Sequence, residues 1–162
     1  MRRMVRLLGP GVAISIAGWA TSQWCGGFRH EPKLPHQPPS WVFGVVWPLL
    51  YVTTGVAWYL SSTQPNPTAD LLLGSVVSLC CAWLVFYICA KARCTGLIII
   101  IIAAALSWVS VGSGALDIVA KWWMVPLALW TTFAATLNAS AVVSTVAPTH
   151  SVHFSTMSTM ST

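Results

Sequence analysis

Long apolar stretches alternate with short polar segments along most of the 162 residues. No Asp, Glu, Lys or Arg occurs in the stretches Trp41–Ala69, Leu71–Ala90 and Cys94–Leu116, or after Lys121. A helix of about 20 apolar residues crosses the hydrocarbon core of a bilayer, so each stretch is long enough to span a membrane. The N-terminal stretch is the least hydrophobic but is also long enough. The pattern therefore predicts an all-α integral membrane bundle of five transmembrane helices, with spans at residues 5–24, 41–60, 71–90, 94–116 and 122–146.

The predicted spans leave little chain outside the membrane, so we expect residues 1–147 to form one transmembrane domain. The longest connection, residues 25–40, holds four prolines, which end helices and indicate an ordered or semi-rigid surface loop. The segment 148–162 is rich in Ser, Thr and His, and we expect a disordered tail there. The basic start and first apolar run are also typical of a signal peptide. The break Gly9-Pro10-Gly11 inside that run favours a retained first helix.

Charged residues are few: they make up 7% of the chain, with a net charge of +5. The eight Lys and Arg residues form no basic stripe, so they indicate anchoring at the membrane surface and no nucleic-acid partner. These basic residues divide equally between the two sides of the predicted bundle. The positive-inside rule, which compares the Lys and Arg on the two sides, therefore predicts no firm topology. Only the cluster Arg2, Arg3 and Arg6 favours an N-terminus on the inside.

Catalytic and metal-binding patterns are not found in the sequence. The three acids, Glu31, Asp70 and Asp117, lie at different predicted interfaces, and no Ser/His/Asp arrangement can be assembled. No ionisable group falls in the middle of a predicted span, which disfavours a pump or an ion-coupled transporter. The five cysteines show no C-x-x-C spacing, and Cys89 falls inside a span, where a thiol acts as a small hydrophobe. We therefore predict no catalytic residue, no metal site and no disulfide.

Aromatic residues share helical faces in the second and fifth spans, because residues at i, i+4 and i+7 or i+8 lie on one side of a helix. Indole rings offer broad apolar contact and an N–H donor, and an asparagine adds one directional polar group. Such faces suit a flat, mostly apolar ligand. The alternative is that these side chains only pack helix against helix, with the asparagine bonded to a neighbouring helix. The candidate ligand-binding residues are Phe43, Trp47, Tyr51, Trp130, Ala134, Leu137 and Asn138.

Small residues recur every four positions on the third span, at Gly74, Ser78 and Ala82. Such a stripe lets another helix approach closely. A homodimer interface and a helix contact within the bundle explain the stripe equally well.

Two segments resemble the translocator protein family, also called the peripheral-type benzodiazepine receptor or tryptophan-rich sensory protein family. Residues 38–51, PPSWVFGVVWPLLY, are similar to the family's P-P-x-W-V-F-x-x-V-W-x-x-L-Y. Residues 126–138, PLALWTTFAATLN, are similar to its P-Y-x-x-W-x-x-F-A-x-x-L-N. The order and spacing of the two motifs and the five-span length all agree with this family.

The resemblance implies a five-helix bundle, often a homodimer, that binds tetrapyrroles such as protoporphyrin IX or haem. Animal members also bind cholesterol and benzodiazepine-site drugs. By position, Trp47 and Trp130 match pocket tryptophans, and the matching residues nearby are Ala134, Leu137 and Asn138. The Tyr and the basic residue that follow the asparagine in the family's sterol motif are missing here. Cholesterol binding through that motif is therefore not expected.

Together these features predict a membrane receptor-like protein that binds a planar hydrophobic ligand between spans one, two and five. A tetrapyrrole is the leading candidate, bound for transport or control, and no cofactor is required. Two alternatives stay open: an enzyme that degrades porphyrin in light, and a sterol or lipid transporter or membrane scaffold. The resemblance offers the mitochondrial outer membrane or another organelle membrane in a eukaryote, and a cell-envelope membrane in a bacterium.

Overall fold

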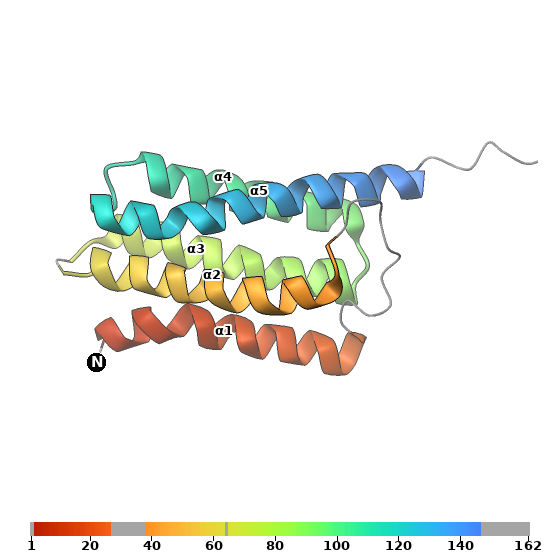
Figure 1. The fold of residues 1–162 in the computed structure, drawn as a ribbon, viewed down its shortest axis with the longest axis horizontal. Helices are drawn as coiled ribbons and strands as arrows, with labels where there is room; N and C mark the ends of the chain where they lie inside the picture. Colours follow the sequence, from red (N-terminus) through yellow and green to blue (C-terminus); the bar gives the residue numbers. More distant parts are fainter. Residues whose placement is uncertain (1, 27–37, 64, 147–162) are drawn as a thin grey trace, which may run out of the picture.

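Figure 1 shows the fold in a computed structural model, which describes residues 2–26, 38–63 and 65–146. Long helices run side by side: α1 (Arg2–Cys25), α2 (Ser40–Ser61), α3 (Pro67–Leu84), α4 (Arg93–Gly112) and α5 (Ile118–Val146). A short π-helical turn, η2 (Val85–Cys89), continues α3. No strand occurs in the described ranges, and five helical segments are long and apolar enough to cross a membrane. The predicted all-α bundle is confirmed; the predicted tail, 148–162, and most of the proline-rich loop lie outside the described residues.

The third helix begins at Pro67 rather than at the predicted Leu71, because the preceding turn caps it. The Asn66 side chain accepts a hydrogen bond from the Ala69 backbone N–H at 3.0 Å, and Pro67 lies in the first helical turn. Both residue types are favoured at a helix N-terminus. The Asn66 amide also donates to the Ala115 carbonyl oxygen at 2.7 Å, which joins the α2–α3 turn to the α4–α5 connection.

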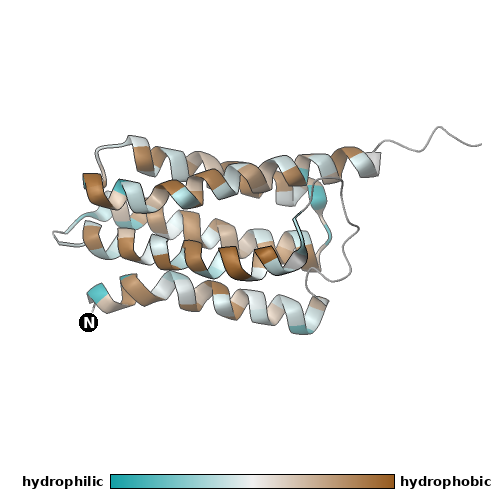
Figure 2. Ribbon diagram, in the orientation of Figure 1, coloured by the Kyte–Doolittle hydropathy of each residue, from teal (hydrophilic) through white to brown (hydrophobic). Residues whose placement is uncertain are grey.

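The helices form a ring in which α1 packs mainly against α2 and α3, α5 against α2 and α4, and α4 against α3. Figure 2 shows hydrophobic residues along the length of the bundle and the more hydrophilic ones mostly near helix ends. α1 is the least enclosed helix. In its most hydrophobic stretch 17% of the residues are buried, against 33–44% in the corresponding stretches of the other four spans. Its outward side chains include Leu8, Val12 and Ile16, which suit contact with lipid.

The N-terminal part of α1 is fixed by close packing and by charge. Gly55 of α2 lies so near the Leu7 carbonyl oxygen that any Cβ at residue 55 would overlap it. Arg6 forms an ion pair with Asp70 of α3, and the other oxygen of this carboxylate accepts a hydrogen bond from Trp58 Nε1 at 2.7 Å. Three helices therefore meet in a polar cluster at this end of the bundle.

Candidate functional site

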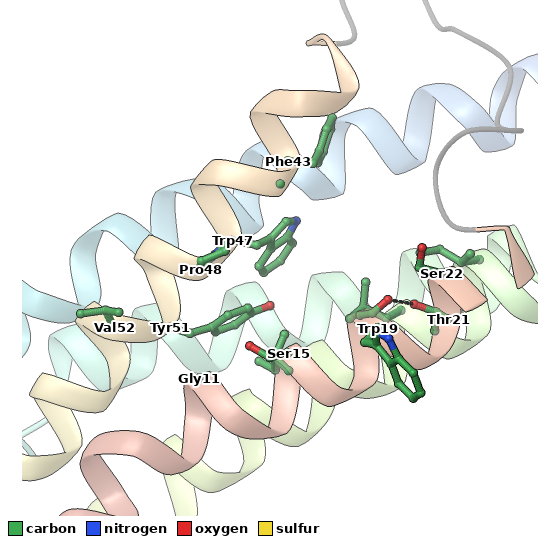
Figure 3. Close-up of a pocket in the computed structure, with 15 residues that line it drawn as sticks. Gly11, Ser15, Trp19, Thr21, Ser22, Phe43, Trp47, Pro48, Tyr51 and Val52 are labelled. Atoms are coloured by element: carbon green, nitrogen blue, oxygen red, sulfur yellow. Dashed lines mark hydrogen bonds between the residues drawn. The ribbon is translucent and has the colours of Figure 1, made fainter. Parts of the chain in front are cut away.

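A partly open cavity of about 570 Å³ lies between α1 and α2, and the end of α3 with η2 completes its lining. Ligand sites in proteins commonly measure about 300–1,000 Å³, so the cavity is large enough for a small organic molecule. Figure 3 shows side chains of both helices around this space. The lining residues are Gly11, Ile14, Ser15, Gly18, Trp19, Thr21 and Ser22 of α1, Phe43, Gly44, Trp47, Pro48, Tyr51 and Val52 of α2, Leu84 of α3 and Ile88 of η2.

The α2 wall of the cavity is aromatic, as the residue spacing predicts. Phe43, Trp47 and Tyr51 are buried and line the cavity from successive turns of the helix. Trp47 stacks on Tyr51, with 5.5 Å between the ring centroids and 19° between the ring planes. The stack gives the cavity a broad, flat surface for contact with an apolar ring.

The α1 wall is built from small and hydroxyl-bearing residues, and the sequence analysis missed it. Gly11, Ser15, Gly18 and Ser22 line the cavity from successive turns, and Figure 3 shows Gly11, Ser15 and Ser22 on this wall. A Cβ added to Gly11 or Gly18 would meet no atom within 4 Å, so these glycines leave open space. Their i, i+4, i+7, i+11 spacing was the signal that could have revealed this face. The low hydrophobicity of the first span therefore reflects a cavity wall.

Trp130 of α5 lies behind the α2 wall and does not line the cavity. Its ring centroid is 5.8 Å from that of Phe43 and 6.4 Å from that of Trp47, in edge-on contacts. Within the described structure, the Nε1 atoms of Trp47 and Trp130 are buried and have no hydrogen-bond partner. A buried donor without an acceptor costs about 1–3 kcal/mol. Both N–H groups would therefore be stabilised by an acceptor atom from a ligand or a water molecule.

The remaining α5 candidates pack within the bundle. The Asn138 side-chain oxygen accepts a hydrogen bond from Trp83 Nε1 at 3.3 Å, and its amide donates to the Ala134 carbonyl oxygen at 2.8 Å. Ala134 is buried, and Leu137 packs against the same core. Asn138 therefore joins α5 to α3, which favours the interhelical alternative. The cavity differs from the expected position in that η2 and the end of α3, instead of α5, complete its lining.

The small-residue stripe on α3 meets two different environments. A Cβ at Gly74 would lie 3.5 Å from the outer edge of the Trp58 ring, so Gly74 serves a contact between α2 and α3. Ser78 is exposed, and Ala82 is half-buried. Part of the stripe, at Gly74, therefore packs inside the bundle. The homodimer stays a prediction.

The prediction of no disulfide is wrong. Cys25, the last residue of α1, is bonded to Cys89, the last residue of η2, with 5.1 Å between their Cα atoms. The sequence analysis placed Cys89 inside a span, whereas the helix ends there and Lys91 takes a positive φ of 50°. The free cysteines are Cys80 (buried), Cys81 (half-buried) and Cys94 (exposed).

The five helices that are long and apolar enough to cross a membrane define a multi-pass membrane protein with a pocket between two of its spans. Among the described residues, no group of three or more His, Cys, Asp or Glu side chains could hold a metal ion. The sequence matches the TspO/MBR family over residues 6–143, and the chain belongs to this family. The family predicted from the two tryptophan-containing motifs is therefore confirmed. No curated protein matches the sequence significantly.

Proposed function

We propose that the protein binds a planar hydrophobic ligand, with a tetrapyrrole as the leading class, in the cavity between α1 and α2. Family membership supports a receptor or transporter in a membrane, and the ligand class rests on the cavity itself. The observation that carries the proposal is the aromatic α2 wall, in which Phe43, Trp47 and Tyr51 line a pocket of about 570 Å³. Within the described residues, the buried Trp47 Nε1 has no hydrogen-bond partner.

A porphyrin suits this cavity in both shape and polarity. Its flat ring would stack against Trp47 and Tyr51, while Gly11 and Gly18 on the opposite wall leave room for it. Its carboxylates would accept hydrogen bonds from donors such as the Trp47 indole. A bond to a charged acceptor contributes about 1.5–3 kcal/mol, more than a bond between neutral groups.

Protoporphyrin IX suits the lining better than haem does. Haem iron is commonly held by His, Cys, Met or Tyr side chains. Of these types, the described lining includes Tyr51 alone, and its ring is stacked on Trp47. A metal-free tetrapyrrole needs no such side chain, so protoporphyrin IX is the first probe to use.

The test is a titration of the detergent-purified full-length protein with protoporphyrin IX in the dark, followed by porphyrin absorbance. Trp47→Phe keeps an aromatic ring and removes the N–H, so we expect saturable binding to weaken about tenfold, or about 1.4 kcal/mol. Trp130 lies behind the cavity wall, against Trp47, so Trp130→Phe should weaken binding less than Trp47→Phe does.

Trp122→Phe is the matched control, because this ring is 70% exposed and lies outside the cavity. It should bind like the wild-type protein. Binding that never saturates, or an affinity that Trp47→Phe leaves unchanged, would contradict the proposal.

A further inference from the structure

The two ends of α1 are held by different kinds of bond, and the cavity lies between them. Near the N-terminus, α1 is fixed by close packing against Gly55 and by the ion pair between Arg6 and Asp70. At the other end, the disulfide between Cys25 and Cys89 joins α1 to η2 covalently. We propose that this disulfide is a redox latch: when a dithiol reduces it, the C-terminal half of α1 is freed and the cavity loses its fixed shape.

The latch lies directly beside residues that line the cavity. Thr21 and Ser22 occupy the turn of α1 before Cys25, and Ile88 is the chain neighbour of Cys89. Any separation of the two cysteines therefore moves lining residues of opposite walls. This proposal concerns the cavity itself and does not depend on which ligand occupies it.

Few side chains in the C-terminal half of α1 are buried among the described residues. From residue 12 to Cys25, only Ile14 and Thr21 are buried, and all other residues are half-buried or exposed. The Thr21 hydroxyl donates to the Gly18 carbonyl oxygen of its own helix at 3.1 Å. Pro10 interrupts the helical hydrogen bonds just before this half, which provides a point for bending.

Reduction of the latch is ordinary thiol–disulfide exchange. A thiolate of the dithiol attacks one sulfur of the Cys25–Cys89 bond, the S–S bond breaks, and the released thiolate takes up a proton. The second thiol of the reductant then attacks the mixed disulfide and releases the protein sulfur that was attacked first, which also takes up a proton. In total, the protein gains two electrons and two protons, and the dithiol becomes a disulfide. Both cysteines are half-buried at helix ends, and access to the sulfur is one of the factors that set the rate of this exchange.

The experiment compares oxidised protein with protein reduced by dithiothreitol, full-length and in lipid nanodiscs. Mass measurement after alkylation should show two additional reactive thiols on reduction. Hydrogen–deuterium exchange should rise severalfold in residues 12–25 and stay unchanged in residues 2–9. Affinity for protoporphyrin IX should fall about threefold, because the α1 wall is no longer pre-organised.

Two variants control the experiment. The double variant Cys25→Ser/Cys89→Ser should match the reduced protein and ignore the reductant. Cys94→Ser removes an exposed free thiol and should keep the full redox response. Because the reduced wild-type protein carries the main comparison, the test holds even if the double variant fails to fold.

Absence of the disulfide from oxidised protein, or equal exchange in both redox states, would overturn the latch. If hydrogen–deuterium exchange changes on reduction while the affinity for a bound porphyrin does not, the link between the latch and the cavity would be overturned. If exchange in residues 12–25 changes and protoporphyrin IX binds in neither state, the latch is supported and the proposed ligand fails.

Discussion

Two buried tryptophans in contact with each other differ in their hydrogen bonding. Trp83 and Trp47 have ring centroids 5.6 Å apart, but Trp83 donates to Asn138, whereas Trp47 Nε1 has no partner among residues 2–26, 38–63 and 65–146. Inside a membrane no bulk water can replace a missing acceptor. The hydrogen bond therefore gives Trp83 a role in joining helices, whereas Trp47 keeps a donor that the ligand proposed above could use.

Replacing Asn138 tests this division. Asn138→Leu leaves the Trp83 N–H without its acceptor, so we expect a loss of about 0.6–1.7 kcal/mol in the free energy of unfolding. Titration with sodium dodecyl sulfate in mixed micelles measures this loss. Adding Trp83→Phe should cost less than the sum of the two single changes, because both partners are then removed. A variant with wild-type stability but no porphyrin binding would instead identify Asn138 as a ligand residue.

Filling the α1 wall tests the cavity. Gly18→Leu places a large side chain into space that is open in the structure, so we expect porphyrin affinity to fall at least tenfold. The fold should be kept, since leucine favours a helix over glycine by about 0.8–1 kcal/mol. Gly9→Leu is the control, because it also meets open space on α1 but lies outside the lining. Equal weakening in both variants would show that the loss comes from α1 as a whole and would contradict the cavity assignment.

At the residue scale, spacing along one helix could be predicted, but contact between helices could not. Phe43, Trp47 and Tyr51 were placed on one face because a single helix decides their alignment. Whether the Trp130 face meets a cavity or a neighbouring helix depends on the rotation of α5, which local periodicity does not determine.

At the scale of elements, helix existence was predictable and helix ends were not. Four uncharged stretches and the N-terminal apolar run located the five spans, since length and polarity decide that outcome. The π-helical turn η2 packs against α1 and α4, and local periodicity does not show such contacts between segments. The disulfide was missed for the same reason, because it joins segments that are 64 residues apart.

The crossing of α1 and α2 provides a test of element packing. Gly55→Ala places a Cβ against the Leu7 carbonyl oxygen, which belongs to the backbone and cannot rotate away. We expect a loss of about 1–3 kcal/mol in the free energy of unfolding from overpacking, measured by the same detergent titration. Gly44→Ala on the same helix meets open space and should not destabilise the protein. Because alanine favours helices over glycine, a stabilised Gly55→Ala variant would refute the close crossing.

At the scale of the whole molecule, the two ends of the bundle differ in chemistry. The N-terminus and the α2–α3 turn lie at one end (Figure 1), where Arg6 pairs with Asp70. The disulfide of Cys25 and Cys89 lies at the other end. Counting charges along the sequence could not orient the protein, because the basic residues divide equally. The disulfide breaks this tie, since such bonds persist in oxidising compartments and are rare in the cytosol.

We therefore expect the disulfide end to face an oxidising compartment and the N-terminus, with its cluster of Arg2, Arg3 and Arg6, to face the cytosol. Cys94 reports on this orientation, because it is exposed, free and located at the start of α4, on the disulfide end. A membrane-impermeant maleimide should label it in sealed cells or vesicles with that face outward, and Cys94→Ser should abolish the labelling. Labelling only after permeabilisation would place this end in the reducing compartment. The latch would then be open at rest, and oxidation, instead of reduction, would be the event that changes the cavity.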